Sequence, residues 1–205
     1  MKSDQRHKCI VIPIIRTPTG NKILTVRDKR FKEWTFITGG CRKREVCDPI
    51  KCALRELDEE TRGVFRITGE LYKYFKFTTK LRSPEELERD RREGLEVTCT
   101  HHVYVFIQDM SNEECKTTVD NFNHEKSRME EKKRNNIPTK KAFDENDILA
   151  FDTYPEFMQR TIWPFILNTL LCNYEFEKIF YCNYTNNDQR LLHYENPQTT
   201  QPRTR

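Results

Sequence analysis

One helical segment constrains the fold of this chain more than any other feature of the sequence. Asp48 and Pro49 form a helix-start signal, because aspartate is a favoured N-cap and proline suits the first helical position. Gly63 offers a stop, since glycine readily adopts the backbone conformation that ends helices. The apolar residues between these signals recur at helical spacing and predict a face that packs on a sheet: Ile50, Ala53, Leu54 and Leu57.

Three glutamates share another side of this predicted helix. Glu56, Glu59 and Glu60 are spaced i, i+3 and i+4, so they lie on one arc of its surface. Like charges at this spacing destabilise a helix by about 0.2–0.5 kcal/mol per pair, which a divalent cation would offset. Carboxylate oxygens suit Mg²⁺ or Mn²⁺, ions that bridge to phosphate oxygens and activate water. Taken alone, the fragment RELDEE is more typical of a solvated acidic helix face than of a metal site. The neighbouring sequence is therefore needed to distinguish the two.

Strand patterns surround the helix. Residues 8–16 and 22–28 predict a β-hairpin around the turn TPTGN, and a short strand at 34–38 is expected to end where Gly39 and Gly40 begin a loop. Aromatic and β-branched residues predict further strands at 72–79, 97–108 and 148–151. This order, with one helix between strands, predicts an α/β fold.

Four segments outside these strands differ in composition. Residues 82–94 are charged and helix-prone, and residues 111–147, with 17 charged side chains, predict a long loop or flexible insertion. Residues 155–171 predict an apolar helix that Pro164 should kink. Residues 183–205 predict a disordered tail after a domain that spans 1–182.

Length, hydropathy and cysteine usage indicate one intracellular domain. The 205 residues suit a single domain, and the longest apolar run, 9–15, is far shorter than the roughly 20 residues that span a bilayer. The N-terminus lacks the pattern of a secretory signal, and the eight cysteines form no CxxC pair. We expect reduced thiols and no membrane partner. Cys41, Cys47 and Cys52 come nearest to a cluster, but their spacing favours buried or incidental thiols over zinc ligands.

Basic residues are concentrated at the start of the chain. Residues 1–44 contain 12 Lys and Arg against three Asp and Glu, although the net charge of the whole chain is only +4. Such an excess beside a catalytic helix suits a phosphate-rich ligand, and a basic surface without a ligand is an equal alternative. The candidate substrate-binding residues are Arg27, Arg42, Lys43, Arg44 and, for base stacking, Trp34. Aromatic residues in strands are nevertheless more often part of the core.

Taken together, these residues resemble the signature of the Nudix superfamily, a glycine, five residues, Glu, seven residues, then Arg-Glu-apolar-x-Glu-Glu-x-Gly-apolar. The matching residues are Gly39, Glu45, Arg55, Glu56, Leu57, Glu59, Glu60, Gly63 and Val64. The resemblance implies an α/β/α sandwich with a mixed central sheet and this box helix packed against it. Nine residues separate Glu45 from Arg55, and two separate Glu60 from Gly63, so the box is longer than the signature. The longer loop leaves open whether Glu45 partners Arg55.

The resemblance also implies roles for individual residues. Glu56, Glu59 and Glu60 would hold Mg²⁺ or Mn²⁺, and a carbonyl oxygen of Gly39 or Gly40 would add a ligand. Glu56 or Glu59 would be the general base, with Arg55 orienting Glu59. A further acid is expected from a later loop. Our candidate is Glu145, and its competitors are Glu125, Glu130, Glu131 and Asp147.

A narrower resemblance concerns the substrate. GGCRKRE and CALRELDEETRG are similar to viral members of the superfamily, especially the ADP-ribose pyrophosphatases of baculoviruses. This implies hydrolysis of ADP-ribose to AMP and ribose 5-phosphate in the cytoplasm or nucleus of an infected host cell. Cellular ADP-ribose enzymes often carry a proline after the box, where this chain has Thr79 and Lys80.

Two alternatives and one partner stay open. The first alternative is removal of the mRNA 5′ cap as m7GDP, with capped RNA as the partner, which fits the basic N-terminal region. The second belongs to another class, a non-catalytic nucleotide- or RNA-binding module with a decayed box. Many Nudix enzymes are dimers, so a homodimer is also expected.

Overall fold

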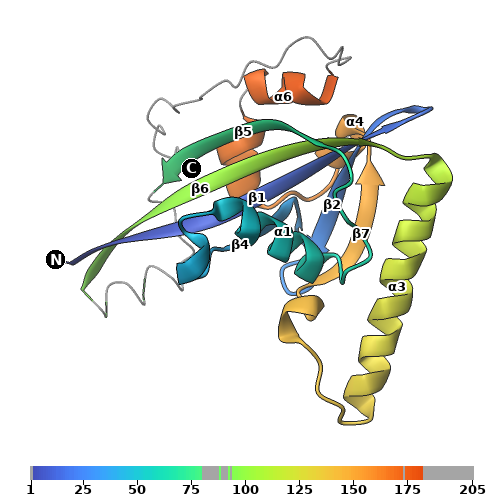
Figure 1. Cartoon of the computed structure of the whole chain (residues 1–205), viewed down its shortest axis with the longest axis horizontal. Coiled ribbons are helices and arrows are strands. Elements are labelled where there is room, and N and C mark those ends of the chain that lie inside the picture. Colours follow the sequence, from blue (N-terminus) through green and yellow to red (C-terminus); the bar gives the residue numbers. More distant parts are fainter. Residues whose placement is uncertain (1, 80–87, 89–91, 93, 173, 182–205) are drawn as a thin grey trace.

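A mixed seven-stranded sheet forms the centre of the molecule (Figure 1). The computed structural model describes residues 2–79, 88, 92, 94–172 and 174–181. The strands that lie side by side are, in order, β3 (Trp34–Thr35), β2 (Gly20–Asp28), β1 (Lys2–Thr17), β6 (Leu95–Asp109) and β5 (Glu70–Thr79). In addition, β4 (Ile37–Gly40) pairs with β1, and β7 (Asn146–Asp152) pairs with β2. The β1–β6 pair is parallel and the other described pairs are antiparallel, so the sheet is mixed as predicted.

The predicted N-terminal hairpin is confirmed, and its first strand is longer than expected. β1 and β2 pair in antiparallel register up to Thr17 and Gly20, where Gly20 adopts a φ of +122° that favours glycine. β1 begins at Lys2 instead of near residue 8, because its N-terminal half pairs with β6 from Leu95 onward. The sequence-distant β6 therefore sets the length of β1.

Helices cover both faces of the sheet, which confirms the α/β/α sandwich. Side chains of β1 alternate between two cores: Ile10, Ile12 and Ile14 face one, and Cys9, Val11 and Ile15 face the other. On the second face lie α1 (Pro49–Glu60) and α3 (Asn112–Arg134), and on the first lie the C-terminal helices (Figure 1). The C-terminal helices are α4 (Tyr154–Met158), α5 (Pro164–Ile166), a π-helical turn (Leu167–Leu171) and α6 (Tyr174–Tyr181).

Helix α1 matches the prediction in extent and differs in one apolar position. Pro49 is its first residue, and beyond its last turn Gly63, at φ +74°, donates its N–H to the carbonyl of Asp58 at 2.8 Å. Ala53 and Leu57 are buried as expected, whereas Leu54 is 44% exposed. Cys52 takes the place of Leu54 in the interface with the sheet, because its side chain lies on the buried arc.

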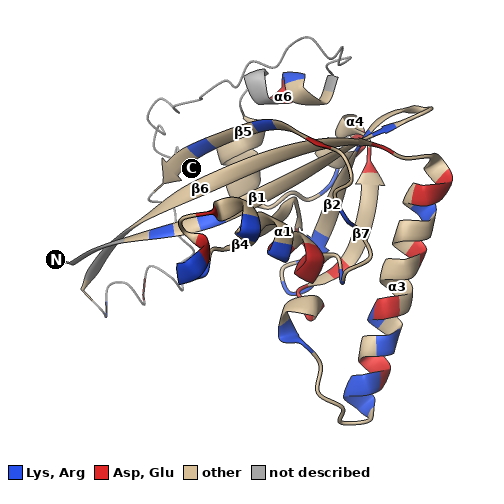
Figure 2. Ribbon diagram, viewed as in Figure 1, with Lys and Arg blue, Asp and Glu red and all other residues tan. Residues whose placement is uncertain are grey.

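The prediction of a long loop or flexible insertion at 111–147 is wrong. Residues 112–134 form α3 (Figure 2). The helix begins with a capping box in which Ser111 and Glu114 exchange hydrogen bonds. Lys and Arg alternate with Asp and Glu along this helix, but a narrow apolar stripe faces the sheet. The buried residues of that stripe are Cys115, Thr118, Phe122 and Met129. The charge count hid this stripe, because only a few apolar residues at helical spacing anchor the helix.

Two smaller expectations also change. Gly39 and Gly40 do not begin a loop, since both pair with β1 as part of β4, and the chain leaves the sheet at Cys41. Pro164 does not kink one long helix; it opens the separate helix α5, where a proline costs no hydrogen bond. The helix-prone stretch 82–94, apart from residues 88, 92 and 94, and the tail 183–205 lie outside the described residues. In addition, 3₁₀ turns cover Lys43–Glu45 and Lys141–Asp144.

Among the described helices, none combines the length and the apolar character needed to cross a bilayer.

Candidate active site

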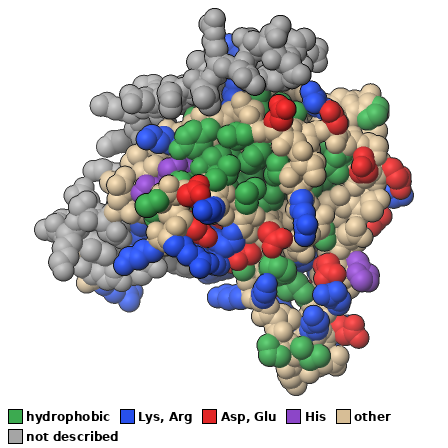
Figure 3. Space-filling view, in the orientation of Figure 1, with side chains coloured by type: hydrophobic (Ala, Val, Ile, Leu, Met, Phe, Trp, Pro, Cys, Tyr) green, Lys and Arg blue, Asp and Glu red, His purple; other side chains and the backbone are tan. Residues whose placement is uncertain are grey.

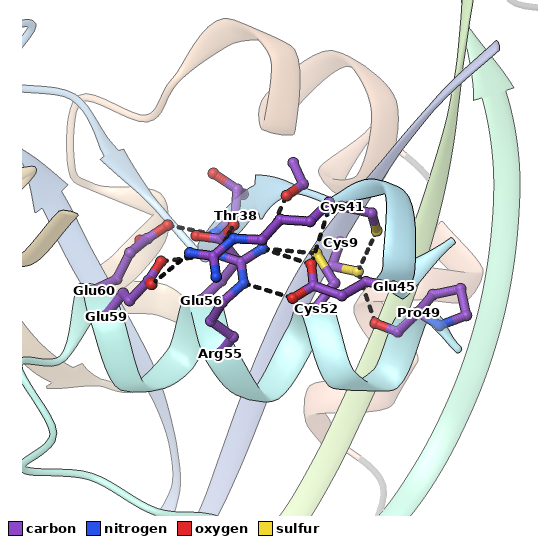
Figure 4. Close-up of polar contacts among 12 residues, drawn as sticks. Cys9, Thr38, Cys41, Glu45, Pro49, Cys52, Arg55, Glu56, Glu59 and Glu60 are labelled. Carbon is purple, nitrogen blue, oxygen red and sulfur yellow. Dashed lines mark hydrogen bonds and ion pairs between the residues drawn. The ribbon is translucent and has the colours of Figure 1, made fainter. Parts of the chain in front are cut away.

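Helix α1 brings the three glutamates against β4 (Figure 4). Glu56 and Glu60 are buried, whereas the side chain of Glu59 keeps 18% of its exposure. Gly39 of β4 lies directly under Glu56, because a Cβ atom at Gly39 would come 1.9 Å from Glu56 Cδ. Glycine is therefore the residue that leaves room for this carboxylate between helix and strand.

Arg55 joins the acidic residues into one network (Figure 4). Its Nε and Nη2 atoms donate to the two carboxylate oxygens of Glu45 at 2.8 and 2.9 Å. Its Nη1 atom donates to Glu56 at 2.7 Å and to Glu59 at 2.8 Å. Nη2 also donates to the carbonyl oxygen of Gly40 at 3.0 Å. One planar cation therefore fixes the loop, the strand and two helix carboxylates relative to one another.

The partnership between Glu45 and Arg55, which the sequence left open, is present. Glu45 ends a 3₁₀ turn, and its carboxylate also accepts the backbone N–H of Arg42 at 2.9 Å. The hydrogen bond from Arg55 lowers the pKa of Glu45 to about 2. The extra residues before the helix are taken up within 41–48, so the longer loop does not move Glu45 out of reach.

Glu60 faces the interior and is held by two hydrogen bonds. The backbone N–H of Thr38 donates to its Oε1 atom at 3.0 Å, and Asn146 Nδ2 donates to its Oε2 atom at 2.9 Å. Burial raises the pKa of Glu60 well above its usual value. Glu60 therefore connects α1 to β4 and to the start of β7.

Burial dominates the electrostatics of Glu56. Burial raises its pKa to about 7, in spite of the opposing ion pair with Arg55. The charge of Glu59 contributes to the same increase. Such a carboxyl group is a suitable position for a cation, because a positive charge would favour its ionised form.

Comparison with known families identifies this arrangement. A family model described as "NUDIX domain" matches residues 6–145. The chain belongs to the NUDIX family. The matched residues contain α1, β4 and Glu45, so the network around Arg55 lies within the family domain. Hydrolysis of a pyrophosphate bond is the activity of NUDIX hydrolases and is the activity of this chain.

Solved NUDIX structures resemble the chain weakly. The NUDIX domain of NrtR from Shewanella oneidensis, complexed with ADP-ribose, is 13% identical at a TM-score of 0.41 and covers 78% of this chain and 79% of its own. A NUDIX family hydrolase from Clostridium perfringens is 13% identical at a TM-score of 0.40 and covers 84% and 96%. The Ap4A hydrolase of C. elegans is 11% identical at a TM-score of 0.38 and covers 52% and 70%. The assignment to the family therefore rests on the match of the family model to residues 6–145 and not on these structural similarities. No curated protein sequence matches the chain.

NUDIX hydrolases generally use divalent metal ions, and the chemistry of the box glutamates suits such an ion. Among the described residues, however, the three carboxylates do not form a group whose oxygen atoms all lie within 4.8 Å of one another. Glu56, Glu59 and Glu60 supply the hard oxygen ligands that Mg²⁺ and Mn²⁺ prefer. Burial is the main cause of the raised pKa of Glu56, and a bound cation would favour the ionised form that burial disfavours. The carbonyl oxygen of Gly40 already accepts from Arg55 and has one lone pair left for a ligand bond.

Of the later acids, Glu145 is the one that lies near the box glutamates. Partial burial and the charge of Glu59 raise its pKa, and its own charge contributes to the raised pKa of Glu60. The competing acids have other surroundings. Asp147 accepts from Arg27 and Lys32, Glu125 pairs with Arg128, and Glu130 and Glu131 are exposed on α3.

The basic candidates divide into two groups. Arg42 donates to Glu59 Oε1 at 3.1 Å, and Lys43 and Arg44 follow it on the exposed 3₁₀ turn beside the site. Figure 3 shows acidic and basic side chains gathered on the face that carries α1.

The second group consists of Arg27 and Trp34. Arg27 is held by Asp147 through two bonds of 2.9 Å. Trp34 is 6% exposed, and the guanidinium of Arg160 lies 3.7 Å from its ring centre. These placements favour structural roles for both residues, whose substrate contacts stay predictions.

The sequence analysis missed two residues that hold the site together. Arg62 is buried with its guanidinium 3.9 Å from the ring centre of Phe122, and its Nε atom donates to the carbonyl of Phe143 at 2.9 Å. Its Nη2 atom donates to the carbonyl of Asn146, whose side chain binds Glu60. Arg62 thus fixes the segment that carries Glu145. The role of Arg62 could not be predicted from the sequence, because its hydrogen-bond partners Phe143 and Asn146 lie 81 and 84 residues later in the chain. Its positive φ of +58° also has no local sequence signal such as a glycine.

Proposed function

We propose that this NUDIX hydrolase cleaves the pyrophosphate of ADP-ribose to AMP and ribose 5-phosphate, using Mg²⁺ or Mn²⁺ held by Glu56, Glu59 and Glu60. Glu145 is the proposed fourth acid. When bound, the cation offsets the negative charge of the carboxylates and the diphosphate and polarises the P–O bonds. The main support for a catalytic role is the set of hydrogen bonds that Arg55 donates to Glu45, Glu56 and Glu59.

This network argues against a decayed, non-catalytic module. A binding module has no need for a mostly buried guanidinium that orients two carboxylates while a third acid holds it from the loop. In a decayed box, substitutions at these positions would leave buried charges without partners, at a cost of several kcal/mol. Here both carboxylate oxygens of Glu45 are satisfied.

Glu59 is our assignment for the general base. Its side chain is more exposed than that of Glu56, at 18% against 11%, so water reaches it more readily. Hydrogen bonds from Arg55 and Arg42 orient its two oxygens separately. Glu56 is buried against Gly39 and is better suited to hold the cation.

The distribution of ion pairs favours a small dinucleotide over an RNA chain. Four of the 12 basic residues that precede residue 45 pair with acids from the second half of the chain. The pairs are Arg16–Asp109, Arg27–Asp147, Lys29–Asp144 and Lys32–Asp147. The exposed run of Arg42, Lys43 and Arg44 lies beside the glutamates, where Arg42 also pairs with Glu59, and this short basic run matches a diphosphate better than a long backbone.

The first experiment compares substrates in parallel. We would incubate the purified protein and its Glu59→Gln variant with Mg²⁺ or Mn²⁺ and either ADP-ribose or RNA labelled in its cap. We expect AMP release that falls by at least about 100-fold in Glu59→Gln, since a general base contributes about 10²–10⁴-fold. Lys51→Gln is the matched control, because Lys51 is an exposed residue of the same helix.

The other results would redirect the assignment. Preferential release of m7GDP from RNA would establish decapping in place of ADP-ribose hydrolysis. RNA affinity that drops steeply with salt would support the same alternative. Retained metal binding without turnover of any dinucleotide would favour the non-catalytic module and overturn the proposed function. Sedimentation of the same samples would test the predicted homodimer.

A further inference from the structure

Three cysteines from separate elements meet beside the glutamate site (Figure 4). Cys9 lies on β1, Cys41 follows β4, and Cys52 lies on α1, one turn before Glu56. Their Sγ atoms all lie within 4.8 Å of one another, and those of Cys9 and Cys41 are 3.4 Å apart. The spacing in sequence contains no CxxC motif, so only the fold brings these thiols together.

We propose that Cys9, Cys41 and Cys52 form a thiolate site for a thiophilic cation, with Zn²⁺ favoured. Zinc–sulfur bonds are about 2.3 Å long, so two sulfurs on one zinc ion lie about 3.8 Å apart. The 3.4 Å between Cys9 and Cys41 lies close to that value, and the other sulfur pairs lie within 4.8 Å, whereas a disulfide would require about 2.05 Å. On binding, the three Sγ atoms lose their protons to water and donate lone pairs to the ion.

The surroundings of the thiols suit a dication. Cys9 and Cys52 are fully buried, and half-buried Cys41 gives access from solvent. The guanidinium Nη2 of Arg55 lies 3.7 Å from Cys52 Sγ. Because that guanidinium also pairs with Glu45, Glu56 and Glu59, it cannot neutralise the thiolates by itself. Three thiolates with Zn²⁺ carry one negative charge, whereas three thiolates with Cu⁺ would carry two, so the dication is favoured. The carbonyl oxygen of Pro49, which accepts from Cys9 Sγ at 3.1 Å, offers a fourth ligand.

This site would differ from the glutamate site in ligand chemistry and in role. Its sulfur ligands are soft, whereas the glutamates supply hard oxygens for Mg²⁺ or Mn²⁺. An ion there would join β1, the end of β4 and the first turns of α1, which together position Gly39, Gly40 and Arg55. The thiolate site therefore supports the frame of the glutamate site and does not depend on which substrate is hydrolysed.

The test uses Co²⁺ as a spectroscopic probe of thiolate ligation. The full chain would be reduced and titrated anaerobically with Co²⁺ in excess Mg²⁺, so that the carboxylates are occupied by Mg²⁺. We expect thiolate-to-cobalt charge-transfer absorption that saturates at one Co²⁺ per chain and disappears when Zn²⁺ or Cu⁺ is added. The Zn²⁺ content of the protein purified without chelator, measured by plasma mass spectrometry, should also approach one per chain. Displacement by Cu⁺ at lower concentration than by Zn²⁺ would identify copper as the ion that the thiolates prefer and overturn the zinc assignment.

Variants separate these thiols from the others. Cys52→Ser should lower the affinity for Co²⁺ at least about tenfold. Cys41→Ser should have the same effect, and because Cys41 is only half-buried, this substitution is less disruptive to folding. Cys47→Ser is the matched control, because Cys47 is exposed in the same loop. The proposal is overturned if no charge-transfer band forms, if the band survives in both variants, or if Cys9 and Cys41 are recovered as a disulfide from protein kept reduced.

Discussion

At the scale of single residues, the glutamates of α1 are held in places that disfavour their charge. Burial raises the pKa of Glu56 to about 7 and also raises that of Glu60 well above its usual value. A carboxyl group with a raised folded-state pKa stabilises the fold below its unfolded pKa, near 4.5, and loses that contribution as pH rises through the folded value. The contribution of Glu56 and Glu60 to the stability of the metal-free protein should therefore fall between pH 5 and pH 8, and a bound cation should oppose this loss. Below about pH 6.5 buried His102 acts in the opposite direction, because burial lowers its pKa to about 4.

Glu56→Gln tests the sign of this effect. The variant removes one titrating group, so its unfolding free energy should change less with pH than that of the wild type. Between pH 5.5 and 8.5, with chelator present, the difference should be roughly 2 kcal/mol, because one pKa unit corresponds to about 1.4 kcal/mol. Urea unfolding at several pH values measures it. Parallel pH curves for the two proteins would contradict the raised pKa.

Glu45→Gln tests the partner of Arg55. The side chain of Glu45 is 7% exposed and that of Arg55 is 16% exposed. Neutralising Glu45 weakens the two charge-assisted hydrogen bonds that hold this mostly buried guanidinium from the loop, although Glu56 and Glu59 still compensate its charge. We expect a loss of about 3 kcal/mol in unfolding free energy and about a 10- to 100-fold fall in kcat with little change in KM. Chemical denaturation and steady-state kinetics measure both.

An ion pair on the solvent side of the same helix supplies the control. Lys51 pairs with Asp48 at 3.0 Å with side-chain exposures of 70% and 45%. Lys51→Gln should cost less than about 1 kcal/mol and leave kcat unchanged. Equal effects of the two substitutions would show that the Glu45–Arg55 contact has no special role.

Residue spacing predicted the box glutamates and Arg55 because all of them lie within one helix, where geometry follows from sequence. The approach of Gly39 to Glu56 was not predictable, since it depends on how α1 packs on β4. Arg62 and Asn146 were missed for the same reason: their contacts join residues 84 and 86 positions apart. Contacts across the fold, unlike contacts along a helix, leave no local periodicity.

At the scale of elements, α3 depends on a few buried side chains. Phe122 is fully buried, and the guanidinium of Arg62 lies over its ring. Phe122→Ala should lower the unfolding free energy by about 3–5 kcal/mol through the cavity and the lost ring contact. Asn123→Ala, an exposed neighbour, should change it by less than about 0.5 kcal/mol.

Hydrogen exchange would locate this effect of Phe122→Ala. Amides of α3 should lose protection in the variant, whereas those of β1 and β6 should keep theirs relative to the new global stability. A uniform loss of protection without local opening of α3 would contradict the view that this stripe anchors the helix.

The error at α3 has a simple physical origin. Charge composition measures whether a segment can bury much surface, but one helix needs only a stripe of residues three to four apart to dock. Cys115, Phe122 and Met129 provide that stripe among many charges. At Pro164 the prediction assumed one continuous helix, whereas residues 159–163 leave helical geometry and allow proline to begin a new one.

At the scale of the whole molecule, the N-terminal hairpin is tied to the second half of the chain. β1 pairs with β6 along its length, and β2 pairs with β7. Ion pairs join the same halves, as between Arg16 and Asp109, 93 residues apart. Strand order was partly predictable from the sequence, but the parallel β1–β6 pair was not, because nothing local in either strand specifies its partner.

This topology predicts a single cooperative unfolding transition. Chains longer than about 150 residues often populate intermediates, so a two-state transition is a demanding expectation here. Trp34 and Trp163 both contact the core under the C-terminal helices, whereas α3 lies on the opposite face of the sheet. Tryptophan fluorescence and far-ultraviolet circular dichroism therefore report on different layers. Because β1 and β2 carry residues of both cores, the midpoints in urea from the two probes should coincide. An earlier circular dichroism midpoint would mean that α3 unfolds first and that the two layers are not coupled through the shared strands.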